Sequence, residues 1–412
     1  MHRAALALLA VVTLTAAMPR TPRVHLATGT IATTSWPYFP GSILPVRVYG
    51  FPAPYQAELL GPGRLLPGGS YEIPERVASG SAWLVAGNAT GLAATHLRIA
   101  SPPPAHRPMF VVASYDDGLI FHNALDFSVL GVLATGGAPS DVAADQTGRI
   151  AATDTQGSVL TLATLAPWSV ARIDGVAFGD ELAIDRTTRA IFVTNRDWNG
   201  SGALTRIAPD GGVTRVATGA TAEGLAIDER RQIVYVANAN DGTIACVDAR
   251  SMRVIRRFPA ASRIFSLALS ADGTRLYGVS NESASSPFGA PGAVVAIAVS
   301  GAEAKVVARS GDLVFPLGIA LDARTQTLFV TDEALGQVYV LDAATLAPRR
   351  APLRTCMTPW KPSLDAASER LYVPCAGADA IDAFDARTLR RISRAPFATG
   401  SYPLAVAILH PT

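Results

Sequence analysis

Two carboxylates occupy equivalent places in neighbouring repeats of the chain. Asp180 lies in the phrase GDELAID and Glu223 in the phrase AEGLAID, each just before a short apolar run that ends in aspartate. Calcium prefers several oxygen ligands, so two converging carboxylates are one way to begin a divalent-metal site. The competing interpretation is a pair of solvated loop carboxylates, because the equivalent positions in later repeats are mostly apolar. Asp180 and Glu223 are therefore candidate metal ligands.

Residue types that are enriched at binding hot spots gather in the predicted loops. Arg196 and Trp198 belong to the loop NRDWNGSG, and Trp360 and Tyr402 add aromatic rings near the expected channel mouth. Tryptophan, tyrosine and arginine dominate binding hot spots, although aromatic residues also pack between repeats. The candidate binding residues on the channel face are Asp180, Asn195, Arg196, Trp198, Glu223, Asn238, Asp332, Trp360 and Tyr402.

Familiar catalytic patterns are missing from the sequence. It contains no GxSxG nucleophile elbow, no HExxH and no CxxC. Of the 6 histidines, only His122 and His410 fall in the repeat region, so no histidine pair is available on the channel face. We therefore assign no catalytic residue, and the main interpretation needs no cofactor.

An internal repeat positions these candidates. Similar apolar phrases recur along the chain and end at Asp145, Asp185, Asp228, Ser270, Asp322 and Asp365. Most are followed by an aromatic residue, a polar turn and a strand that ends in aspartate, where the carboxylate is expected to cap the bend. A repeat of about 40–45 residues has room for four strands, which is one blade of a β-propeller. β-Branched and aromatic residues favour strands, so we predict an all-β fold.

The two ends of the repeat region complement each other. Residues 109–136 look like a blade without its first strand, and residues 402–409 look like a first strand alone. Pairing the two would close the ring and remove its exposed sheet edges. Six complete units and this shared one predict a seven-bladed β-propeller over 109–412.

Several phrases resemble known propeller families. VYVAN (234–238), FVTN (192–195), FVTD (329–332) and VLDAATL (340–346) resemble the YVTN-type β-propeller repeat family, which stands with the WD40-like and quinoprotein amine dehydrogenase-like seven-bladed propellers. EGLAID, which begins at Glu223, is similar to a phrase of the gluconolactonase and regucalcin group. That group uses a central set of Glu, Asn and Asp around a divalent ion. The resemblance implies an alternative function, a divalent-metal-dependent lactonase or hydrolase that holds Ca²⁺ with Asp180 and Glu223.

The register also bears on the three cysteines. Cys356 precedes the loop into a first strand, and Cys375 begins the next loop on the same face of the predicted ring. A disulfide between them is therefore geometrically possible. Cys246 lies within a predicted third strand, where a small buried hydrophobic residue is expected.

The segment before the repeats has three parts. Residues 1–17 combine a basic start, an apolar run and small residues, the pattern of a secretory signal peptide cleaved near Ala17. Residues 20–100 alternate in short strands separated by Pro and Gly, and GLAATHLRIA resembles the last strand of bacterial immunoglobulin-like modules. This predicts a small Ig-like β-sandwich. Residues 101–108 form a stiff Pro-rich linker.

The composition limits the classes of function. The 412 residues are 49% hydrophobic and 17% charged with a net charge of +2, which suits a packed, turn-rich protein. No basic stripe points to nucleic acid, and no later apolar run is long enough to be a transmembrane segment. We expect a secreted, periplasmic or extracellular monomer. Its main interpretation is a non-enzymatic propeller that binds a protein, glycan or small ligand through its loop-rich channel face.

Overall fold

The computed structural model describes residues 27–197, 200–281, 291–300, 304–392 and 395–410. The predicted signal peptide and Trp198 lie outside this part of the chain. One compact unit ends at Pro103 and also takes in Leu130–Gly136, and a second contains Pro104–Val129 and the chain from Gly137 onward. Regular structure in the described residues is all strand except for the short 3₁₀ turn η2 (Ala376–Ala378). No described helix is long and apolar enough to cross a membrane.

The first unit consists of short strands in small sheets. Their orders are β1-β9-β8-β5, β3-β7-β6 and β2-β4. In β8, Ala82, Leu84 and Ala86 are buried while Trp83 between them is exposed, as in a sheet with one face on a core. The strands are β1 (Ala27–Thr28), β2 (Thr30–Ile31), β3 (Ile43–Pro45), β4 (Val48–Tyr49), β5 (Gln56–Leu60), β6 (Arg64–Leu66), β7 (Ser70–Glu72), β8 (Gly80–Gly87) and β9 (Gly91–Ile99).

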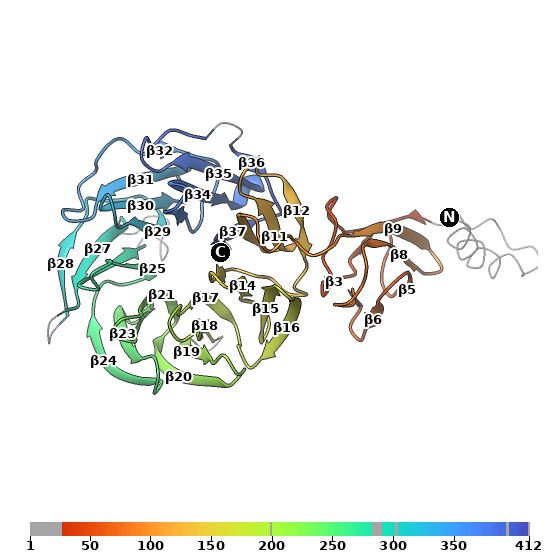
Figure 1. Ribbon diagram of the computed structural model, residues 1–412, viewed down its shortest axis with the longest axis horizontal. Coiled ribbons are helices and arrows are strands. Elements are labelled where there is room, and N and C mark those ends of the chain that lie inside the picture. Colours follow the sequence, from red (N-terminus) through yellow and green to blue (C-terminus); the bar gives the residue numbers. More distant parts are fainter. Residues whose placement is uncertain (1–26, 198–199, 282–290, 301–303, 393–394, 411–412) are drawn as a thin grey trace, which may run out of the picture. The chain divides into compact units, whose positions relative to one another are not determined.

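The second unit is a β-propeller, a ring of four-stranded antiparallel sheets that follow one another along the chain (Figure 1). The sheet that opens the ring contains β10 (Met109–Ser114), β11 (Gly118–Asn123), β12 (Val129–Leu133) and β37 (Pro403–Leu409). The next three sheets are β13 (Val142–Ala144), β14 (Arg149–Ala152), β15 (Val159–Leu165) and β16 (Trp168–Asp174); β17 (Gly179–Ile184), β18 (Ile191–Arg196), β19 (Ser201–Ile207) and β20 (Val213–Ala220); and β21 (Ala222–Asp228), β22 (Ile233–Asn238), β23 (Thr243–Asp248) and β24 (Arg253–Pro259).

Three further sheets complete the series. They are β25 (Ile264–Leu269), β26 (Arg275–Ser280), β27 (Ala293–Ala298) and β28 (Lys305–Arg309); β29 (Pro316–Asp322), β30 (Thr327–Asp332), β31 (Gln337–Asp342) and β32 (Leu353–Arg354); and β33 (Ser363–Asp365), β34 (Arg370–Cys375), β35 (Ala380–Asp385) and β36 (Phe397–Ala398). The predicted all-β class is confirmed.

The last strand of the chain joins the first sheet of the ring. β37 runs antiparallel to β10, with Met109 opposite Leu409 and Ala113 opposite Ala405. Strands from opposite ends of this unit therefore share one sheet. Such pairing ties the two ends of the unit together and covers the edge of β10 that would otherwise be open.

The recurring residues of the repeat have structural roles, as predicted. The carboxylate of Asp248 accepts the backbone N–H groups of Arg250 and Ser251, at 3.2 and 2.7 Å, and so caps the turn after β23. The aromatic residues of the second strands pack inside the sheets and are at most 2% exposed: Phe110, Phe192, Tyr235, Tyr277, Phe329 and Tyr372.

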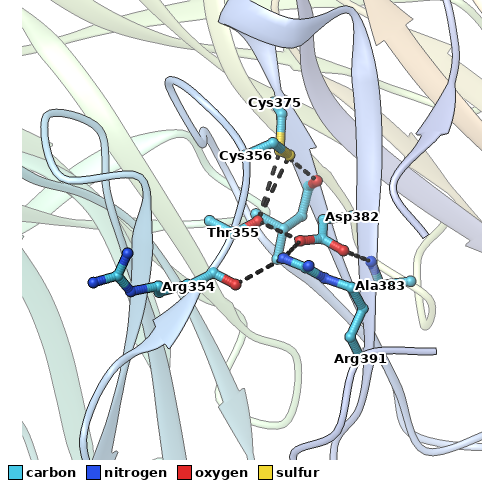
Figure 2. The surroundings of a disulfide bond; sticks show 8 residues. Arg354, Thr355, Cys356, Cys375, Asp382, Ala383 and Arg391 are labelled. Carbon is cyan, nitrogen blue, oxygen red and sulfur yellow. Dashed lines mark hydrogen bonds and ion pairs between the residues drawn. A yellow bond between two sulfur atoms is a disulfide. The ribbon is translucent and has the colours of Figure 1, made fainter. Parts of the chain in front are cut away.

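A disulfide joins Cys356, in the segment after β32, to Cys375 at the end of β34 (Figure 2). Their Cα atoms lie 5.8 Å apart. The hydroxyl of Thr355 lies beside both sulfur atoms and donates to the buried carboxylate of Asp382 at 2.9 Å. Arg391 also donates to Asp382, at 2.8 Å. The bridge and this polar cluster fasten two consecutive sheets of the ring, while Cys246 is free and buried.

Candidate functional site

A cavity of about 130 Å³ lies among the starts of the first strands in the second unit. We call it the channel pocket. One side carries the charged residues Asp141, Asp180, Glu181, Arg196, Glu223 and Lys361. The other side carries the apolar residues Phe265, Leu317, Trp360 and Leu404. Ser140 and Ser266 also line the cavity. The volume suits a small ligand, because sites for drug-sized molecules span about 300–1,000 Å³.

Irregular strand starts bring consecutive residues to the pocket. The pairing register shifts between Gly179 and Leu182 in β17, and again between Ala222 and Leu225 in β21. A β-bulge adds a residue to one strand and re-aims side chains that strict alternation would send to opposite faces. Asp180 and Glu181 consequently line the same cavity although they are neighbours in sequence.

Arg196 links two of the pocket carboxylates. Its Nη2 lies 3.0 Å from Asp180 Oδ1, and its Nη1 donates to Glu223 Oε1 at 3.1 Å. Besides burial, the neighbouring Asp180 carboxyl also disfavours ionisation of Glu223 and so raises its pKa. The Glu223 side chain is only 5% exposed. A single guanidinium therefore contacts both members of a carboxyl pair that is largely shielded from water.

Lys361 links the other two. Its Nζ lies 2.8 Å from Asp141 Oδ2 and 3.4 Å from Glu181 Oε1. Asp141 also accepts the backbone N–H of Leu182 at 2.9 Å, and Glu181 accepts that of Leu225 at 2.8 Å. These bonds hold both carboxyls in place from three different sheets.

The environment shifts the titration of both glutamates. Burial, reinforced by the neighbouring Asp180, raises the pKa of Glu223 well above its ordinary value. Burial likewise raises the pKa of Glu181 from 4.5 to about 7, although Lys361 acts in the opposite direction. Near pH 7, Glu181 is consequently near the midpoint of its titration, and Glu223 keeps its proton to a higher pH than an ordinary glutamate does. One cavity holds a proton donor and a potential proton acceptor.

The charged side does not fit a calcium ion well. Arg196 already lies between Asp180 and Glu223, and Lys361 between Asp141 and Glu181. In the described residues, no group of three or more His, Cys, Asp or Glu side chains is arranged to hold a metal ion. The site provides its own cations where a divalent ion would otherwise neutralise the carboxylates.

The predicted site residues divide into two sets. Asp180, Arg196, Glu223 and Trp360 line the channel pocket, and the ring of Tyr402 lies beside that of Trp360 with centroids 6.4 Å apart. The other three described candidates are buried and bond within the blades. Asn195 donates to Ala177 O, Asn238 to Thr218 O, and Asp332 accepts the backbone N–H groups of Phe315 and Leu335.

Sequence reasoning missed three charged members of the pocket. Asp141, Glu181 and Lys361 each directly follow a residue that the repeat register places at the channel, namely Ser140, Asp180 and Trp360. The sequence did contain a signal for them, since in three repeats a charged residue comes one position after the residue expected at the channel. Strict strand alternation would have turned these residues away from the channel.

Solved structures share this fold at low sequence identity. A periplasmic gluconolactonase from Pseudomonas aeruginosa is 15% identical with a TM-score of 0.60, covering 73% of this chain and 98% of that chain. Hydrazine synthase from Kuenenia stuttgartiensis is 14% identical with a TM-score of 0.58, covering 76% and 92%. A streptogramin B lyase structure is 11% identical with a TM-score of 0.53, covering 65% and 86%. No family model and no curated protein matches the chain. These likenesses confirm the predicted β-propeller fold, which supports many chemistries.

Proposed function

We propose that the protein hydrolyses a small cyclic ester, a lactone, with Glu181 and Glu223 as the base and acid of the channel pocket. The observation that carries the proposal is the pair of buried glutamates with raised pKa values beside Arg196 in one cavity. Buried groups with shifted pKa values in a cleft are typical of acid–base sites. A gluconolactonase among the structures of the same fold supports the choice of a lactone as substrate.

The reaction uses the two glutamates in opposite protonation states. The Glu181 carboxylate takes a proton from water as the water oxygen attacks the lactone carbonyl carbon. Arg196 has five N–H donors, and those that Asp180 and Glu223 leave unused would stabilise the developing oxyanion in this mechanism. The ring C–O bond then breaks, and Glu223 gives its proton to the departing oxygen. The product is the open hydroxy acid, and proton exchange with solvent restores both glutamates.

The proposed reaction does not depend on a divalent metal, because Arg196 and Lys361 neutralise the pocket carboxylates. We expect the purified protein to hydrolyse γ-butyrolactone or glucono-δ-lactone faster than buffer alone, at the same rate in EDTA and in calcium. The melting temperature should also be equal in the two conditions. A pH-stat and a thermal melt measure both quantities. Hydrolysis that requires calcium, with a calcium-dependent rise in melting temperature that Glu223→Ala abolishes, would instead support Asp180 and Glu223 as Ca²⁺ ligands.

A specific observation also supports the non-enzymatic interpretation. The buried Asp141 carboxylate pairs with the partly exposed Lys361 and accepts additional backbone bonds, an arrangement suited to fixing a binding pocket in shape. Under this interpretation the channel pocket binds a small ligand without changing it. Ligand-dependent stabilisation with no product formed over long incubation would favour binding over hydrolysis.

We also propose a blade number for the propeller, a fold for the first unit and a cellular location for the protein. The seven consecutive four-stranded sheets support a seven-bladed ring of YVTN-type repeats, and the three small sheets of the first unit support an Ig-like sandwich. The apolar N-terminal pattern and the disulfide support export to an oxidising compartment. The chain would then act in the periplasm or outside the cell.

A further inference from the structure

The channel pocket has one apolar side, which the acid–base proposal does not use. Phe265, Leu317, Trp360 and Leu404 come from four consecutive first-strand segments and line this side of the cavity. The carboxyls and Arg196 come from the other first-strand segments and from the end of β18. A ligand in the pocket therefore meets charged groups on one side and hydrocarbon on the other.

Two polar atoms on the apolar side have no hydrogen-bond partner in the described part of the chain. One is the hydroxyl of Ser266, a residue that is only 3% exposed, and the other is Nε1 of Trp360. A buried polar atom left without a partner destabilises the protein, so most buried polar atoms have a hydrogen-bond partner. Both residues line the cavity, so a bound molecule with one or two oxygen atoms could satisfy these polar atoms.

A line of aromatic rings extends from the pocket to the surface. The ring of Trp360 lies 6.4 Å from that of Tyr402, which lies 6.1 Å from that of Tyr115. Tyr402 is 41% exposed and has a left-handed φ of 54°. Its backbone N–H donates to Asp379 at 2.9 Å and its carbonyl accepts from Tyr115 at 3.1 Å, so the ring is held in an exposed position. We call Trp360, Tyr402 and Tyr115 the aromatic track.

We infer that the preferred substrate is a lactone with an apolar alkyl or acyl side chain, which lies along the aromatic track while the ring ester occupies the channel pocket. This inference rests on the proposed lactone hydrolysis. A side chain that buries methylene groups on Trp360 and Tyr402 gains about 0.8 kcal/mol for each group, or about fourfold in affinity.

A polyhydroxylated sugar lactone fits this arrangement poorly. Its hydroxyl groups would lie against Phe265, Leu317 and Leu404, whose side chains offer no donor or acceptor. Among the described side chains on that side, Ser266 and Trp360 are the ones with an unused hydrogen-bonding atom for a ligand oxygen. Each further hydroxyl would lose its hydrogen bonds to water without a replacement, which lowers the affinity.

The inference is tested with γ-butyrolactone, γ-hexalactone and γ-decalactone, which share a ring and differ in the side chain, and with glucono-δ-lactone. We expect kcat/KM to rise with side-chain length by up to about fourfold per buried methylene, and glucono-δ-lactone to be the poorest substrate. Tyr402→Ala should reduce the ratio between γ-decalactone and γ-butyrolactone at least tenfold. The control Tyr49→Ala removes an exposed tyrosine of the first unit and should leave that ratio unchanged.

A binding measurement separates failure of this inference from failure of the proposed function. The corresponding γ-lactams are not readily hydrolysed, and calorimetry can measure their affinity directly. If no lactone is hydrolysed but lactams bind more tightly with longer side chains, the hydrolase proposal is wrong and the apolar recognition stands. If glucono-δ-lactone is the best substrate, or if neither kcat/KM nor lactam affinity depends on side-chain length, the inference is overturned.

Discussion

Glu223→Gln is expected to reduce kcat/KM for lactone hydrolysis by about 10²–10⁴-fold, the usual contribution of a positioned acid or base. The glutamine amide has the shape of the carboxylic acid but cannot give a proton to the departing ring oxygen. The raised pKa of Glu223 favours its neutral carboxylic acid, which the glutamine amide imitates in both shape and charge. Steady-state rates with the spontaneous reaction subtracted measure the effect.

A matched control separates chemistry from folding. Glu333 is also a carboxyl whose pKa is raised by burial, but it does not line the channel pocket. Glu333→Gln should retain the wild-type rate with γ-butyrolactone, which has no side chain to lie on Tyr402, and both variants should melt near the wild-type temperature. If folded Glu223→Gln keeps kcat/KM within about twofold of the wild type, Glu223 does not supply the proton.

Lys361→Met is expected to lower the free energy of unfolding by about 2–4 kcal/mol at pH 8, measured by urea denaturation. The substitution leaves the buried carboxyls of Asp141 and Glu181 without their cation. This expected loss is smaller than the largest losses seen when one partner of a buried ion pair is removed. The reasons are that backbone N–H groups still bond both carboxyls and that Lys361 is 31% exposed.

The unfolding free energy that Lys361→Met loses should increase as the pH rises. Glu181 has a folded-state pKa above its unfolded value, so the folded protein holds that proton over a range in which the unfolded chain has lost it. Its ionisation therefore reduces stability as the pH rises from about 4.5 through about 7. Without Lys361 this effect grows, so the variant's deficit should be larger at pH 8 than at pH 5.

Arg324→Met is the control for this experiment. Arg324 is 55% exposed and lies 3.3 Å from Glu369 in a surface ion pair. Exposed pairs contribute about 0–1 kcal/mol, so the control should lose far less stability than Lys361→Met. Equal losses in the two variants would show that the pocket ion pair is not a buried structural element.

The fold could be predicted from the sequence because every blade repeats the same requirements. Tyr235 and its equivalents are buried, and Asp248 and its equivalents cap the turns. Packing and turn chemistry therefore make the same residue types recur at the same positions of each sequence repeat. The side chains buried between blades must be similar because each sheet packs on a similar neighbour. The roles of Asn195, Asn238 and Asp332 were less visible, since a polar residue at a strand end can face either a ligand or the blade.

The candidate site was only partly predictable. Asp180 and Glu223 stand at the register position that points into the channel, and the structure places both there. Glu181 was missed because a bulge interrupts the strand alternation on which the prediction relied. The pairing of Lys361 with Asp141 spans 220 residues and arises from closure of the ring, so no local pattern indicates it.

The pH dependence of kcat/KM tests the acid–base account most directly, because it reports the ionisation of the essential groups in the free protein. Our account predicts a rising limb near pH 7, where Glu181 becomes ionised. The mechanism also requires a falling limb, where Glu223 loses the proton that its raised pKa retains. Glu181→Gln should lose the rising limb together with most of the rate. A profile that rises steadily with hydroxide concentration, parallel to the spontaneous reaction and unchanged in Glu181→Gln, would contradict the account.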